Sequence, residues 1–197
     1  MTSQTRRTSG GPILQDDVTE AIEAAFFAEL GRVGYGRLSI DAVAKRAGVG
    51  KAAVYRRWRS KLDLTVALVS KFAVAAVDVP DTGSLHGDVR QYLANGRAAL
   101  MHPLARTIIP DMLSEATRTP ELATVLGEAV REPRRAKAAE LFERAVRRGE
   151  LPPETDIGLA MDLMAGPLYW RLAVMQVEVT DEYCDRLATA VVAAVTA

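Results

Sequence analysis

One stretch constrains the fold of this chain more than any other: residues 38–61, LSIDAVAKRAGVGKAAVYRRWRSK. Ser39 suits the N-cap of a short helix over residues 40–46, because its hydroxyl oxygen can accept a hydrogen bond from a free first-turn amide. Gly48 then breaks this helix, and a second short helix is predicted over residues 50–57. Two short helices joined by a glycine turn form a helix-turn-helix.

The small and apolar side chains of this stretch fall on one side of the two helices. Ala44 and Ala47 are small enough for the helices to cross closely, while Val54 and Trp58 can seat the second helix on the first. In such motifs the second helix enters the major groove of DNA, and its outward side chains meet bases and phosphates. Tyr55 also has the alternative of being a packed amphipathic residue. The outward set is Lys51, Ala52, Tyr55, Arg56 and Arg57.

Charge is polarised along the chain, although the total is zero. Residues 1–61 hold 11 Lys and Arg against 6 Asp and Glu, whereas the remainder holds 14 against 19. Seven cations and no acid lie from Lys45 to Lys61. A basic end on an otherwise acidic chain indicates an anionic partner such as nucleic acid, the alternative being a solvated helical face.

Helical periodicity continues through the rest of the chain, and no stretch shows convincing strand alternation. We therefore predict an all-α fold of about nine helices, with a three-helix head and a larger helical body. The predicted helices span residues 12–33, 40–46, 50–57, 61–77, 85–101, 103–117, 120–148, 156–177 and 181–196. The predicted division is a disordered arm at 1–11, a helix-turn-helix DNA-binding domain at 12–60 and a body at 61–197.

Signatures of catalysis and of metal binding fail on inspection of the sequence. The fragment GVGK resembles part of a phosphate-binding loop, but Lys45 stands where that loop needs glycine and Ala52 where it needs Ser or Thr. His86 and His102 lack partners at zinc-ligand spacing. We therefore expect neither an enzyme nor a bound metal or cofactor.

Cysteine content and hydropathy indicate the compartment. The single cysteine, Cys184, excludes an intramolecular disulfide and suits a reducing cytoplasm. The most apolar stretch, near residues 64–79, is too short and too charged to span a bilayer. We therefore expect a cytoplasmic protein without a membrane partner.

The helix-turn-helix stretch resembles the DNA-binding segment of the TetR family of transcriptional regulators. That segment has Ser or Thr before an apolar helix, an Ala-Gly-Val turn, and a recognition helix ending in Tyr, two basic or polar residues and an aromatic, followed by Lys. The matching residues are Ser39, Ile40, Val43, Ala44, Ala47, Gly48, Val49, Tyr55, Trp58 and Lys61. The resemblance covers about residues 14–64 and implies a repressor that binds a palindromic double-stranded DNA operator as a homodimer.

The residues and the resemblance together predict the DNA contacts. Lys61, in the first turn of the next helix, adds a cation where free backbone amides already favour an anion. Gly50 departs from the family, which often has Ser or Thr there, so a side-chain cap and a phosphate contact are missing. The predicted contact residues are Ser39, Gly50, Lys51, Ala52, Tyr55, Arg56, Arg57 and Lys61.

The body also resembles this family, through the segment LPPETDIGLAMDLMAGPLYWRLAV at residues 151–174. The resemblance implies that residues 61–197 bind an unidentified small-molecule effector and form the dimer. Met112, Met164 and Trp170 are predicted to line the pocket, because adaptable Met-rich walls suit apolar ligands; ordinary core packing is the alternative.

The last two predicted helices are expected to pair with their counterparts in a second copy of the chain. Their stripe of small and apolar residues suits a close four-helix interface. The stripe consists of Leu187, Ala190, Val191, Ala194 and Val195. A different class of function, a helical carrier or scaffold whose head does not bind DNA, remains the competing hypothesis. The basic run with Tyr55 and Lys61 argues against it.

Overall fold

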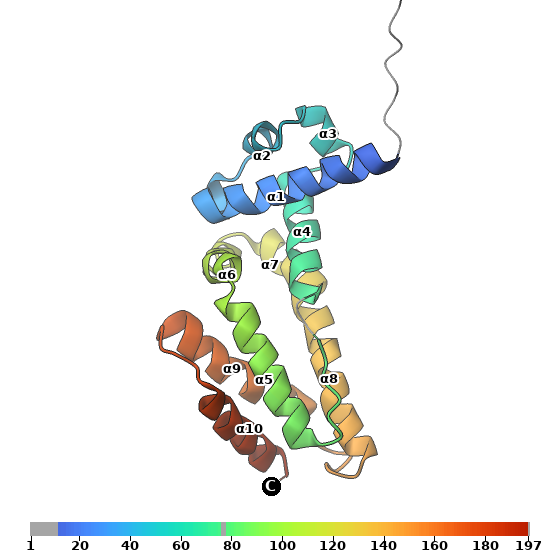
Figure 1. Cartoon of the computed structure of the whole chain (residues 1–197), viewed down its shortest axis with the longest axis vertical. Helices are drawn as coiled ribbons and strands as arrows, with labels where there is room; N and C mark the ends of the chain where they lie inside the picture. The colour runs from blue at the N-terminus through green and yellow to red at the C-terminus, as the bar shows by residue number, and fades with distance from the viewer. Residues whose placement is uncertain (1–11, 76–77, 197) are drawn as a thin grey trace, which may run out of the picture. The chain divides into compact units, whose positions relative to one another are not determined.

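The computed structural model describes residues 12–75 and 78–196, and every regular element within them is helical (Figure 1). The all-α prediction is therefore confirmed; the predicted arm lies outside the described residues. In chain order the elements are α1 (Pro12–Arg37), α2 (Ile40–Arg46), α3 (Lys51–Tyr55), α4 (Lys61–Ala75), α5 (Leu85–Met101), α6 (Pro103–Ala116), α7 (Pro120–Leu126), the π-helical turn η1 (Gly127–Arg131), α8 (Glu132–Arg147), α9 (Ile157–Tyr169), a second π-helical turn η2 (Trp170–Val174) and α10 (Asp181–Thr196).

Contacts divide the chain into two compact units, Met1–Thr65 and Val66–Ala197. The division falls within α4, whereas the sequence-based boundary is at residue 60. Each unit has its own set of buried apolar side chains.

The first unit is a small core formed by one face of α1 together with α2, α3 and the start of α4. Ile22, Phe26 and Leu30 lie four residues apart on α1 and are almost completely buried, as helical periodicity requires of an inward stripe. Val54 of α3 and Leu64 of α4 have no exposed surface. Because α1 contacts α2 and α2 contacts α3, this core fixes which faces of α2 and α3 point outward.

The end of α1 differs from the prediction. The helix was expected to stop at residue 33, but one more turn follows, as far as Arg37. Gly34 interrupts it with φ 74° and ψ 167°, a conformation that costs a residue without Cβ little. The amide of Leu38 donates to the carbonyl of Gly34 at 3.1 Å and closes this turn. Gly34 thus bends the chain from α1 towards the start of α2.

α5 is the central helix of the second unit. It contacts α6, α8, α9 and α10, and Figure 1 shows it between α8 on one side and α9 and α10 on the other. Leu85, Val89 and Leu93 form its buried stripe, together with Phe142 of α8 and Met164 of α9. The body is therefore a helical bundle wrapped around α5.

The predicted helix over residues 120–148 is interrupted by η1. The amide of Glu132 donates to the carbonyl of Gly127, five residues back rather than four. Pro133 follows directly, and proline has no amide hydrogen with which to continue the α-helical pattern. The missing donor accounts for the change of register. With α7, η1 and α8 taken as one helix, and α9 and η2 as another, the described residues form the nine helices predicted.

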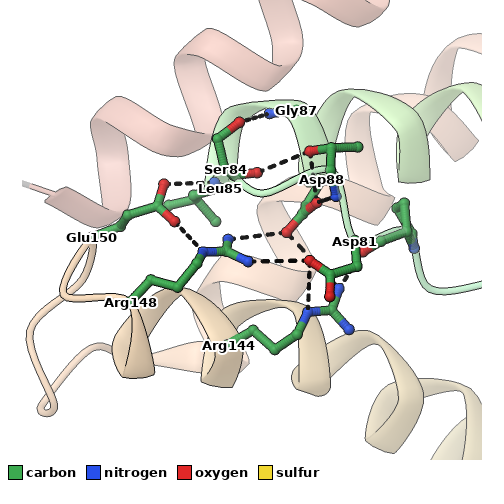
Figure 2. A network of polar contacts seen from close by, with 10 residues as sticks. Asp81, Ser84, Leu85, Gly87, Asp88, Arg144, Arg148 and Glu150 are labelled. Carbon is green, nitrogen blue, oxygen red and sulfur yellow. Dashed lines mark hydrogen bonds and ion pairs between the residues drawn. The ribbon is translucent and has the colours of Figure 1, made fainter.

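A polar network joins the loop before α5 to the end of α8 (Figure 2). The fully buried carboxylate of Asp88 accepts hydrogen bonds from the Thr82 amide at 2.6 Å and the Thr82 hydroxyl at 2.8 Å, and pairs with Nη2 of Arg148 at 3.0 Å. Glu150 binds Arg148 from the other side and accepts the Leu85 amide at 2.6 Å. Asp88 and Glu150 thus each have a partner on another segment.

Burial by itself raises the pKa of Asp88, because it disfavours the charged carboxylate. Hydrogen bonds from Thr82 and the guanidinium of Arg148 outweigh burial, so the pKa is lower than the ordinary value of an aspartate. Asp88 therefore stays ionised in the folded protein and stabilises it as an anion.

We expect Asp88→Asn to lower the free energy of unfolding at pH 7 by about 2 kcal/mol, because it removes the buried charge that strengthens the hydrogen bonds from Thr82 and Arg148. The folded-state pKa of Asp88 is lowered, so its contribution is complete above the unfolded value of about 3.9. It is lost as the pH falls through the folded value. The difference between the two proteins should therefore be constant from about pH 8 to 5 and shrink below about pH 4. Urea unfolding across this range measures it.

Asp162→Asn is the matched control, because Asp162 pairs with Arg135 at 2.7 Å while its side chain remains 68% exposed. Its effect should stay below about 1 kcal/mol. Equal effects of the two substitutions would show that the Asp88 network contributes no more than a surface pair.

Candidate functional site

The α2–α3 segment is held by backbone features that the sequence indicated. The Ser39 hydroxyl accepts a hydrogen bond from the Ala42 amide at 3.2 Å and caps α2, as predicted. Gly48 has φ 68°, which glycine adopts readily, and the Val49 amide donates to the Ala44 carbonyl at 3.0 Å. Gly50 stands at the N-cap of α3 without a side-chain hydrogen bond. The two helices therefore meet in the expected helix-turn-helix.

The start of α4 is capped reciprocally. The hydroxyl of Ser60 accepts the Asp63 amide at 3.0 Å, and the carboxylate of Asp63 accepts the Arg59 amide at 2.7 Å. Each side chain thus satisfies an amide at the beginning of the helix. The first turn of α4 is consequently well fixed beside α3.

The outward face of α3 carries most of the predicted residues. Val54 and Trp58 are buried, as expected of the face turned towards α1 and α2. Lys51, Ala52 and Arg56 are exposed, and Tyr55 exposes 45% of its surface. A five-residue helix thus presents one cation, one small residue and one phenol side by side to solvent.

Arg57 does not share this outward face, although the sequence placed it there. Its Nε donates to the hydroxyl of Thr19 on α1 at 2.8 Å, and its Nη1 donates to the Ala53 carbonyl at 3.0 Å. The guanidinium is therefore turned back onto the head, where it ties the end of α3 to α1.

Lys61 is also bound within the head. Its ammonium donates to the carbonyl of Tyr35 at 3.1 Å and lies 4.3 Å from the centroid of the Tyr35 ring. The π face of the ring attracts the cation. The side chain is half-buried, so its charge is held in a fixed place rather than moving freely in solvent.

A hollow of about 350 Å³ opens where α2, α3 and the start of α4 meet. Three cations line it, against one carboxylate. Sequence reasoning had named four of its eight residues and missed Ile40, Asp41, Arg59 and Ser60; for Arg59 the signal was its place in the cation run. The lining residues are Ser39, Ile40, Asp41, Lys51, Tyr55, Arg59, Ser60 and Lys61.

The carboxylate in the hollow pairs with one of the cations. Oδ1 of Asp41 lies 2.8 Å from Nζ of Lys51, and both side chains are more than half exposed. The hydrogen bond and the charge of Asp41 raise the pKa of Lys51, so the lysine stays cationic. Lys51 also lies 5.7 Å from the centroid of the Tyr55 ring, which orients it along α3.

The residues predicted to line a ligand pocket lie in different surroundings. Met112 and Met164 are buried, with 5% and 1% of their surfaces exposed, whereas Trp170 is 56% exposed. A separate cavity of about 220 Å³ is lined by the end of α5, by α6 and by the end of α9 with η2. None of the three residues is among its lining residues.

The residues predicted for a dimer interface differ in what they offer a partner. Ala190 and Ala194 are exposed on α10, and Leu187 and Val195 are half-buried against the core. Val191 is only 2% exposed and belongs to the core of its own unit. Of the predicted stripe, the two alanines are therefore the residues most open to a partner.

Membrane-spanning helices and clusters of metal ligands are absent from residues 12–75 and 78–196. No helix of these residues is both long and apolar enough to cross a bilayer. Over the same residues, His, Cys, Asp and Glu side chains do not gather in groups of three or more that could ligate a metal ion.

Comparison with known families and relatives gives consistent similarities. A family model described as "Bacterial regulatory proteins, tetR family" matches residues 22–68, and one described as "Tetracyclin repressor-like, C-terminal domain" matches residues 79–191. The chain is 30% identical to the uncharacterized HTH-type transcriptional regulator YdeS of Bacillus subtilis over 164 residues, 83% of this chain and 82% of the relative.

Two more similarities cover most of the chain. The DNA-binding transcriptional repressor TetR of Mycobacteroides abscessus is 30% identical over 155 residues, 78% of this chain and 81% of the relative. Among solved structures, the TetR family transcription regulator SCO0332 superposes with a TM-score of 0.71 at 25% identity, covering 90% of this chain and 97% of that one.

Proposed function

The chain belongs to the TetR family of bacterial regulatory proteins, and from that premise we propose that it is a repressor: a homodimer that binds a palindromic operator and is released by a small-molecule ligand. Members of this family are DNA-binding transcription regulators rather than enzymes. The relative from Mycobacteroides abscessus, named as a repressor, supports the direction of regulation.

The observation that carries the proposal is the cationic hollow beside the exposed face of α3. With α3 in the major groove, Lys51, Ala52 and Tyr55 face base edges and the adjoining phosphates. A phosphate of the same strand enters the hollow, where Lys51, Arg59 and Lys61 surround it. The free amides at the start of α4 add to the attraction, because a helix N-terminus carries partial positive charge.

The fixed position of Lys61 makes this hollow more effective. Because the Tyr35 carbonyl and ring already hold its ammonium, binding a phosphate there costs little side-chain ordering. Arg57 contributes indirectly, by holding the end of α3 against α1. Ser39 contributes by capping α2 at the rim of the hollow.

Dimerisation is proposed through α9 and α10. Leu159, Trp170 and Val174 expose half or more of their apolar surfaces on α9 and η2, and Ala190 and Ala194 are exposed on α10. A large apolar side chain left exposed in one copy gains most when a second copy covers it. Two such helices from each copy form a four-helix interface, and the two copies of the head are then related by a two-fold axis.

Selection of bound fragments from random double-stranded DNA tests the proposed function directly. We expect a palindrome whose half-sites are about one helical turn, or a multiple of it, apart. If no sequence is enriched, and if the protein is not retained on non-specific DNA at low salt, the carrier or scaffold hypothesis is favoured instead.

Lys51→Ala should weaken binding to every DNA sequence and reduce the slope of log K against log[salt] by about 0.9, the change expected for one lost phosphate contact. Fluorescence anisotropy between about 50 and 200 mM salt measures both. Lys137→Ala on α8 removes the same charge outside the helix-turn-helix and should leave the slope unchanged. An unaltered slope in the combined variant Lys51→Ala, Tyr55→Phe and Lys61→Ala would refute the interface.

The Asp41–Lys51 pair provides a sharper version of this experiment. Asp41→Asn removes a negative charge beside the phosphate and releases Lys51, so DNA should bind more tightly. The gain should be smaller in the Lys51→Ala background, because part of it acts through Lys51; a double-mutant cycle measures the difference.

Ala190→Glu with Ala194→Glu should convert the dimer to monomers and abolish high-affinity operator binding. Both alanines are exposed in one protomer, so the substitutions leave its core intact, but in the dimer they bury uncompensated charges. Sedimentation velocity at about 10 μM measures the change. Ala136→Glu, at an exposed alanine of α8, is the control and should remain dimeric. A monomeric unmodified protein at this concentration would disprove the interface.

A further inference from the structure

We infer that the cavity between the end of α5, α6 and the end of α9 binds a small organic anion with one ring system or a short chain and one carboxylate. The inference rests on the proposed function only in making this anion the effector. The binding site itself follows from the shape, lining and charge of the cavity.

The cavity is small, and its lining combines aliphatic side chains with polar groups in about equal measure. Its volume of about 220 Å³ lies below the range of ~300–1,000 Å³ that is usual for drug-sized ligands, so a single ring system fills it. Leu100 of α5, Ile109 of α6 and Leu172 of η2 supply aliphatic walls from three separate elements. Such a wall favours a flat or slender apolar group over a sugar or a nucleotide.

A cation, Arg106, is among the residues that line this cavity. Arg106 is exposed on α6, and among the described residues its guanidinium has neither an ion pair nor a hydrogen bond. A second arginine, Arg171 of η2, already has partners: it donates a hydrogen bond to the Glu178 carbonyl and stacks over the Tyr183 ring. No carboxylate belongs to the lining of the cavity, so the charge of Arg106 is available for a ligand. A planar guanidinium pairs best with a carboxylate, in two parallel hydrogen bonds.

The second polar group is the side chain of Gln176, which an unusual backbone conformation holds in the lining of the cavity. Gln176, also in the lining, has φ 54°, a left-handed conformation that residues with a Cβ rarely adopt. The Val177 amide donates to the Arg171 carbonyl at 3.0 Å and the Met175 amide to the Trp170 carbonyl at 2.8 Å, which hold this conformation after η2. Strained residues and π-helical turns of this kind concentrate at binding sites. The Gln176 side chain can donate to the carboxylate beside Arg106.

The test uses 2-naphthoate as the probe and its neutral isostere 2-naphthamide as the comparison. Calorimetry on the full-length protein should give naphthoate an affinity at least ten times that of the amide. Arg106→Gln should reduce naphthoate binding to the level of the amide and leave amide binding unchanged. Arg106→Lys should keep part of the preference, since it retains charge without the planar pair of donors.

Two controls separate the site from general effects. Arg131→Gln removes the same charge from an arginine paired only with Glu132 on the surface, and should change neither affinity. Ala173→Phe fills the cavity and should abolish binding of both probes, while the thermal midpoint shows that the variant folds. Undetectable binding of naphthoate at millimolar concentration, or equal binding to Arg106→Gln and unmodified protein, overturns the inference.

The same titrations in the presence of selected operator DNA distinguish this inference from the proposed function. If the anion is the effector, operator and naphthoate weaken each other's binding by the same factor, of about 5- to 150-fold. Arg106-dependent binding that operator DNA does not change would sustain the site and refute release by its ligand. Loss of DNA binding alone in the Lys51 variants would leave the site intact.

Discussion

α3 has only five residues, and a helix of that length has no stability of its own in water. It exists because Val54 and, just beyond it, Trp58 are buried in the small core built on α1. The same is true of the seven-residue α2, which buries Ile40, Val43 and Ala44. Burial of one face of each helix thus exposes the other face, and the surface proposed to contact DNA is a consequence of this packing.

That dependence explains how the cations of the head are used. A helix face can offer only a few outward positions, and on α3 Lys51, Tyr55 and Arg56 occupy them. Two other cations serve the framework: Arg46 pairs with the buried Glu29 of α1 at 2.7 Å, and Arg57 donates to Thr19. Hydrogen bonds from Arg32 and Arg46 hold the pKa of Glu29 below its ordinary value, so this internal anion persists. The basic run therefore contains structural cations beside those proposed to bind DNA.

The body applies the same principle around α5, with different consequences at its two ends. At the start of α5, the Asp88 network joins three segments through hydrogen bonds and ion pairs (Figure 2). At the other end, the helices diverge around a cavity that Arg106 borders without a partner among the described residues. The Asp88 network thus fixes one end of α5, while the other end borders a cavity. In such an arrangement a ligand can change the packing around the cavity without unfolding the unit.

The sequence by itself determined the periodic and local features. Apolar spacing predicted the helices, including the bounds of α2, α5 and α10, and Ser39 and Gly48 indicated the cap and the turn. These depend on neighbours within about four residues, which a sequence displays directly. Tertiary structure determined the hydrogen-bond partners of the long side chains. Arg57 donates to Thr19, 38 residues away, and Lys61 donates to Tyr35, 26 residues away. Tertiary structure also turned Val191 inward and brought Arg59 to the hollow, because those outcomes depend on elements that are distant in the chain.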